Sequence, residues 1–172
     1  GVYDRVVNDL GVPKGSFKVT DLIIMVRQIK SPTALKRVRR VTSVTEVLKD
    51  WEDTPKFQDL LVYDPKKDEL VPTDALLKGK SAFINSILET TKGYATYASM
   101  LLDLKLRAWA KERAVAVFSV DKKLLEAPAT GELNFRYVQL FEKWNPLDSA
   151  QNEKKFKDEF EKILQEKIKG TG

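Results

Sequence analysis

The sequence predicts an α+β fold in which a small, mostly antiparallel sheet over about residues 20–73 precedes an all-helical region. Two observations support this prediction. The first part contains short runs rich in Val, Ile and Thr, separated by turn-forming residues. From Ser81 onward turn signals are few and helix-forming residues dominate. We therefore expect two regions, a β-rich part over residues 1–75 and a part of about four helices over 76–172.

The β-rich part begins with a helical pattern and continues with two strand patterns. The first ten residues place apolar side chains at helical spacing, and Gly11 and Pro13 follow as stop signals. Residues 21–29 (DLIIMVRQI) form a nearly continuous apolar run, which is typical of a strand buried on both faces. After a loop at residues 31–33, residues 37–48 (RVRRVTSVTEVL) predict a longer antiparallel strand with one polar face.

A hairpin is predicted next, at residues 60–71 (LLVYDPKKDELV). Two apolar runs flank a centre that is rich in Asp, Pro and Lys, so we expect a loop of four or five residues. Helices follow, and Ser81 and Thr96 each stand where an N-cap is expected. The predicted helices cover about residues 81–91, 96–118, 133–144 and 149–169.

Composition excludes several kinds of chemistry. The 172 residues include no Cys and no His, which removes the usual zinc ligands, catalytic triads and the commonest general base. The carboxylates offer no substitute, because Asp64 and Asp68 flank the predicted turn, and the glutamates of residues 159–166 alternate with lysines on a solvated helix face. We therefore predict no catalytic residue and no metal site.

A phosphate-binding loop is also not predicted. The nearest match is Gly79-Lys80-Ser81, which lies at the start of a helix. The GxxxxGK[ST] pattern requires an earlier glycine so that backbone N–H groups can approach phosphate, and Thr73 or Asp74 stands there instead. Ser81 is better explained as the N-cap of the following helix.

The positive charge is concentrated near the start of the chain. The net charge is +5, and residues 1–40 hold nine Lys or Arg against three Asp or Glu. The cluster Lys36-Arg37-Val38-Arg39-Arg40 could meet phosphates, nucleic acid or anionic lipid, or it could be a charged strand that keeps a sheet edge soluble. Both interpretations remain open at this point.

The last predicted helix carries a narrow apolar stripe between dense Lys and Glu positions. This arrangement is typical of a helix that docks along one seam. We predict that the seam is an interaction surface, formed by Phe156, Phe160, Ile163 and Leu164.

Three segments of the first part resemble a known family. They are VYDRVVNDLGVP (residues 2–13), KVTDLIIMV (18–26) and KRVRRVTSVTEV (36–47), and the hairpin LLVYDPKKDELV follows them in the same order. The series resembles the end of the motor domain of type II/IV secretion system ATPases, above all the archaeal GspE-like and archaellum motor proteins. The resemblance is specific over residues 1–73 and loose over 74–120, where Arg107 matches a central arginine.

The resemblance implies that this chain is the C-terminal portion of a cytoplasmic, hexameric, P-loop motor at the inner face of a membrane. Its partners would be the upstream part of the same protein, further subunits and a membrane-embedded platform protein, whereas nucleic acid is not expected. ATP and Mg²⁺ would serve the parent, because the nucleotide-binding, acidic and histidine motifs would all lie upstream. Arg37, Arg39 and Arg40 match the family's basic strand and are candidates for a place near nucleotide or a subunit boundary.

Two other classes of function are compatible with the residues. A small nucleic-acid-binding module would use the basic segment 27–40, and its affinity would fall steeply as salt rises. A protein-interaction adaptor would use the seam on the last helix, and changing Phe160 and Leu164 to Asp would abolish its complexes.

Overall fold

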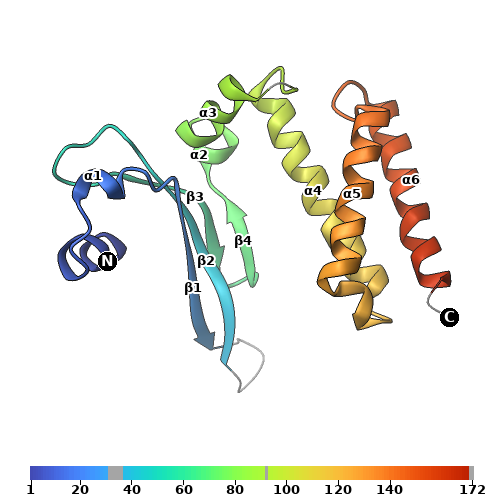
Figure 1. Cartoon of the computed structure of the whole chain (residues 1–172), viewed down its shortest axis with the longest axis horizontal. Helices are drawn as coiled ribbons and strands as arrows, with labels where there is room; N and C mark the ends of the chain where they lie inside the picture. Colours follow the sequence, from blue (N-terminus) through green and yellow to red (C-terminus); the bar gives the residue numbers. More distant parts are fainter. Residues whose placement is uncertain (31–36, 92, 171–172) are drawn as a thin grey trace. The chain divides into compact units, whose positions relative to one another are not determined.

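The computed structural model describes residues 1–30, 37–91 and 93–170. Within these residues the chain forms two compact units, Gly1–Tyr97 and Ala98–Gly172. The first contains a four-stranded antiparallel sheet with short helices, and the second is helical (Figure 1). The predicted α+β fold is confirmed. The two units divide between Tyr97 and Ala98, so the helices that directly follow the sheet belong to the first unit.

The sheet is a meander of order β1-β2-β3-β4. Its strands are β1 (Leu22–Lys30), β2 (Arg37–Val47), β3 (Phe57–Asp64) and β4 (Glu69–Pro72). Each strand pairs antiparallel with the next one along the chain, and Asp64 pairs with Glu69 across a four-residue loop. That loop length was predicted. The predicted loop at residues 31–33, and Lys36 beside it, lie outside the described residues.

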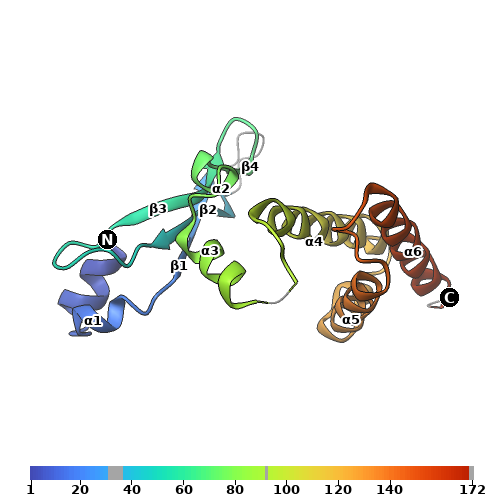
Figure 2. The same cartoon turned by 90° about the horizontal axis from the view of Figure 1, so that it is seen from above.

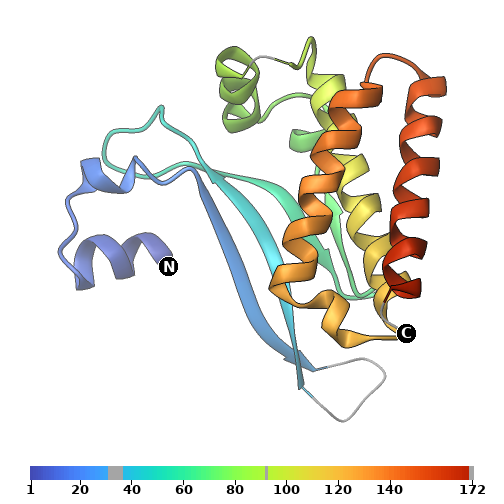
Figure 3. The same cartoon turned by 45° about the vertical axis from the view of Figure 1, so that its right-hand side comes forward.

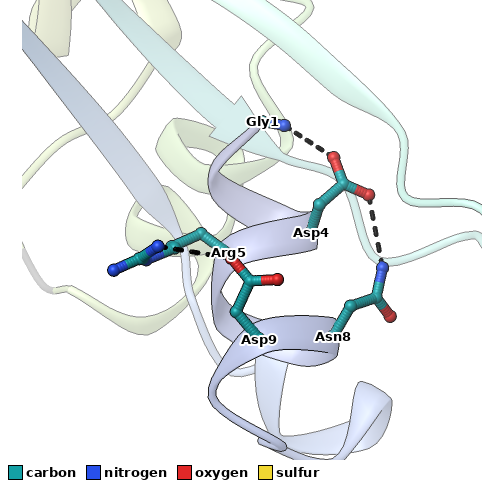
Figure 4. A network of polar contacts seen from close by, with 5 residues as sticks. All are labelled: Gly1, Asp4, Arg5, Asn8 and Asp9. Carbon is teal, nitrogen blue, oxygen red and sulfur yellow. Dashed lines mark hydrogen bonds and ion pairs between the residues drawn. The ribbon is translucent and has the colours of Figure 1, made fainter.

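Two helices precede the sheet and close one end of it. They are η1 (Asp4–Asp9), which is a π-helix, and α1 (Lys14–Phe17). Polar contacts run along η1, where Asp4 accepts hydrogen bonds from the Gly1 amino group at 2.6 Å and from Asn8 at 3.5 Å, and Arg5 pairs with Asp9 (Figure 4). Below these helices a small core buries the side chains of Phe17, Val47 and Trp51.

The first unit ends with α2 (Asp74–Leu77) and α3 (Ala82–Thr90). The second contains α4 (Tyr97–Phe118), the short 3₁₀ helix η2 (Lys122–Leu125), α5 (Ala127–Trp144) and α6 (Ala150–Lys169). Ser81 caps α3, as predicted, and Ser149 caps α6. Each hydroxyl accepts a hydrogen bond from the backbone N–H three residues on. Helix α5 begins six residues before its predicted start at Leu133.

Aromatic side chains hold the helical unit together. Helices α5 and α6 run side by side (Figures 2 and 3), and Tyr137 contacts both Phe156 and Phe160 edge-to-face. On the other flank of α6, Trp109 of α4 packs against Phe160, with ring centroids 5.7 Å apart. Helix α6 therefore supplies the apolar stripe on which both α4 and α5 pack.

Candidate functional site

The predicted arginines lie where β1 ends and β2 begins, and both strands carry cationic side chains there. Arg27 pairs with Arg40, Gln28 with Arg39, and Lys30 with Arg37. Residues directly opposite each other share a face of the sheet, and like charges there repel. The pairing thus places like charges opposite each other twice, in Arg27–Arg40 and in Lys30–Arg37. Neighbouring carboxylates or a bound anion would reduce the repulsion within each pair.

Arg40 is the arginine whose charge the fold neutralises. Its Nε and Nη2 atoms donate to the two carboxylate oxygens of Asp68, at 2.8 and 2.7 Å, and the hydroxyl of Tyr63 donates to the same carboxylate at 2.6 Å. Hydrogen bonds from Arg40 and then Tyr63 lower the pKa of Asp68 to about 2. The bond to Asp68 likewise raises the pKa of the Tyr63 phenol.

The contact between Arg40 and Asp68 also holds the loop between β3 and β4 in place. Asp68 has a φ of 55°, in the left-handed region that Asp tolerates better than most residues. The forked guanidinium binds the carboxylate through two parallel bonds and joins β2 to the β3–β4 loop. Arg40 therefore acts as a structural residue in this chain, and the exposed Arg37 and Arg39 remain as the candidates for contact with an anion or a neighbouring subunit.

The start of α3, where the GKS tripeptide lies, holds a carboxylate instead of a phosphate. The Phe83 N–H donates to Glu46 at 2.6 Å, and the Ile84 N–H donates to the Ser81 hydroxyl at 3.1 Å. Glu46 belongs to β2 and is only 2% exposed. A carboxylate and a hydroxyl of the protein itself therefore accept the two N–H groups that a phosphate would need at this helix start.

Glu46 was not singled out from the sequence, although it organises the junction between the sheet and α3. Gln58 of β3 donates to Glu46 at 3.5 Å and to the Lys80 carbonyl at 3.0 Å. The Tyr97 hydroxyl donates to the Leu76 carbonyl at 2.8 Å, and burial, with a smaller effect of the Glu46 charge, raises the pKa of that phenol. A signal was present in the sequence, because Glu46 is the one carboxylate within the Val- and Thr-rich segment 37–48.

The predicted seam on the last helix is not a surface for a partner. Phe156, Phe160 and Leu164 are at most 1% exposed and lie in the core of the helical unit, and Ile163 packs against that core. The amphipathic pattern identified the correct face of α6, but that face docks on α4 and α5 of the same chain. We correct this prediction accordingly.

Exposed apolar side chains occur on the sheet as well as on the helices, where Val115 and Phe135 are examples. Strand β1 was predicted to be buried on both faces, and this prediction is wrong, because Ile24 is 60% and Val26 58% exposed. Ile24 pairs with Val44, and the row continues through Leu61 to Pro72 across all four strands. β1 is an edge strand, so no further strand covers it within the described residues.

Two further observations limit the kinds of site that are present. The described ranges contain no group of three or more acidic side chains arranged to hold a metal ion. None of the helices described is long and apolar enough to cross a membrane. In comparisons with known proteins, the chain matches no family model and no curated protein.

Proposed function

We propose that this chain is the C-terminal part of a hexameric motor ATPase of the type II/IV secretion class, and that it supplies packing and subunit-interface surface without catalytic groups. The observation that carries this proposal is the apolar row Ile24–Val44–Leu61–Pro72 on the sheet. Ile24 and Pro72 at the two ends of the row are exposed, and Val44 and Leu61 between them are half-buried. Apolar side chains exposed in this way can mark a place where another protein surface packs. The ordered resemblance over residues 1–73 supports the upstream catalytic domain as the partner of this surface.

The unpaired edge of β1 supports the same proposal. A nine-residue edge strand presents backbone N–H and C=O groups that another strand can pair with, and proteins usually protect such an edge. Here Ile24 and Val26 add exposed apolar side chains to that edge. A chain with both features gains stability when a further part of the protein, or another subunit, covers them.

In the whole motor, ATP and Mg²⁺ would bind to the upstream domain. The exposed Arg37 and Arg39 would lie at a subunit boundary or near nucleotide bound by the parent. The motor would work at the cytoplasmic face of a membrane, on a membrane-embedded platform protein. This chain by itself would then neither bind ATP tightly nor hydrolyse it.

The complete open reading frame tests the proposal directly. It should encode GxxxxGK[ST], an acidic box, a Walker B carboxylate and a histidine box upstream of these 172 residues. An open reading frame without these motifs would refute the proposal, as would ATP hydrolysis by the purified 172-residue chain.

A co-purification experiment tests the sheet surface itself. The upstream part is expressed separately with a tag, and its capture of this chain is measured. Ile24→Asp together with Val26→Asp should abolish capture, because two charges would be buried in an apolar contact. Arg27→Asp is the matched control, since it places a carboxylate on the opposite face of the same strand. Equal capture of both variants would contradict the assigned surface.

A nucleic-acid-binding module is the second candidate, and the cations Arg27, Lys30, Arg37 and Arg39 favour it. No aromatic residue stands among the described residues of this segment to stack on bases. Binding of single- or double-stranded oligonucleotides at increasing salt decides the question. Affinity that falls steeply with salt would support this module, whereas no binding at low salt would exclude it.

A further inference from the structure

A groove of about 390 Å³ opens between α4 and α5 in the helical unit. Ala110 and Ala114 line it from α4, Leu133 from α5, and Phe160 of α6 lies at its base with only 1% of its side chain exposed. Leu125 of η2 closes one end. The volume lies in the range of ligand pockets, and such pockets occur between the helices of bundles.

The groove exists because α4 presents small side chains where it faces α5. Ala110 and Ala114 lie one turn apart and are both buried, whereas the larger Leu106 and Phe118 on the same helix fill the space on either side. Protein cores are otherwise packed without voids of this size. The hollow is therefore a specific feature of these two turns of α4.

The polar side chains that line the groove are cationic or neutral, and they include Arg107 of α4 and Tyr137 of α5. Lys111 stands on the α4 rim, and Thr130 and Asn134 on the α5 rim, whereas no carboxylate lines the groove. Asp103, near one end, is buried and accepts hydrogen bonds from Arg107 at 2.9 Å and Tyr137 at 3.2 Å. Among the ion pairs of the described residues none includes Lys111, so its charge is available to an anion.

We propose that this groove binds an amphipathic monocarboxylate with a single alkyl chain. The alkyl chain of the ligand would lie on Ala110, Ala114 and Leu133. Its carboxylate would pair with the Lys111 ammonium and accept hydrogen bonds from Asn134 or Thr130. Apolar lining with a few polar groups at one rim suits a ligand with an apolar body and one charged end. The proposal concerns the helical unit alone and does not depend on the proposed motor function.

Decanoate, below its critical micelle concentration, is the probe, and decyltrimethylammonium is the control ligand with the same chain and opposite charge. Isothermal titration calorimetry on the full 172-residue chain should detect binding of decanoate. Decyltrimethylammonium should bind much more weakly. Shortening the chain to octanoate should weaken binding, by up to about fourfold per methylene removed. Amide NMR shifts should move at Ala110, Ala114 and Leu133. Equal affinity for both ligands, or shifts confined to other residues, would overturn the proposal.

Two pairs of variants locate the site. Ala114→Trp fills the groove and should abolish decanoate binding, whereas Ala116→Trp, on the exposed side of α4, should leave it unchanged. Lys111→Glu should weaken binding about three- to tenfold, and Lys105→Glu should not. The lysine pair keeps the test decisive if Ala114→Trp does not fold, because both lysines are exposed. Loss of binding in both lysine variants, or in neither, would refute the assigned carboxylate position.

Discussion

Replacing Glu46 with Ala should destabilise the sheet unit by about 2–4 kcal/mol. The Glu46 carboxylate is buried and accepts the Phe83 N–H at 2.6 Å. Its removal leaves a partly buried donor without an acceptor, which costs up to about 1–3 kcal/mol. The carboxylate also lies at the positive end of α3, where a partly buried negative charge contributes up to about 2 kcal/mol. The two effects overlap, so their sum is an upper bound.

Thermal unfolding followed by circular dichroism measures this loss, and 1 kcal/mol corresponds to a shift of about 4–8 °C for a unit of this size. Because the chain has two units, amide hydrogen exchange at Phe83 and Ile84 provides a local measurement. Ser81→Ala is the reference, since loss of an N-cap typically costs about 1 kcal/mol. If Glu46→Ala costs less than Ser81→Ala, and exchange at Phe83 does not accelerate, the assigned role of Glu46 is wrong.

Three further predictions concern other parts of the chain. Phe156→Ala should cost about 3–5 kcal/mol in urea unfolding of the helical unit, because the ring is fully buried, and near-wild-type stability would contradict the assigned core. NMR titration should give the Asp68 carboxyl a pKa of about 2, and Arg40→Ala should move that pKa toward 3.8. Because the pKa is lower in the folded state, the contact with Arg40 stabilises the fold at pH values above 3.8. That stabilisation is lost as the pH falls through about 2. Asn145, which ends α5 with a φ of 42°, should tolerate Gly within a few tenths of a kcal/mol, whereas Ala should cost about 1 kcal/mol, and equal effects of the two substitutions would contradict a left-handed cap.

Local patterns predicted the elements of this fold well, because each depends on nearby residues. Ser81 identified the start of α3 through its hydroxyl. The Asp- and Lys-rich centre of the hairpin predicted a loop of four or five residues, and the loop has four. Helix α5 is longer than predicted, and its first turns contain the poor helix formers Pro128 and Gly131. Pro128 stands in the first turn, where its missing N–H costs nothing, so the helix begins before it.

The wrong predictions concern what covers a given face of a strand or helix. The covering element is distant in sequence, so local patterns do not reveal it. The run of residues 21–29 was apolar enough for a buried strand, yet β1 lies at the edge of the sheet and leaves Ile24 and Val26 exposed. The stripe on α6 was identified, but its periodicity could not distinguish α4 and α5 from a separate protein. Glu46 and the groove beside Ala114 were missed because each depends on side chains from several elements.

The two proposals concern different units, and this makes their failures separable. The apolar row through Ile24 belongs to the sheet unit, and the groove beside Lys111 belongs to the helical unit. Ile24→Asp should therefore leave decanoate binding unchanged, because no groove residue belongs to the sheet unit. Lys111→Glu should likewise leave capture by the upstream part unchanged. If either variant abolished both activities, one surface would have to depend on the other, and the assignment of each surface to its own unit would be wrong.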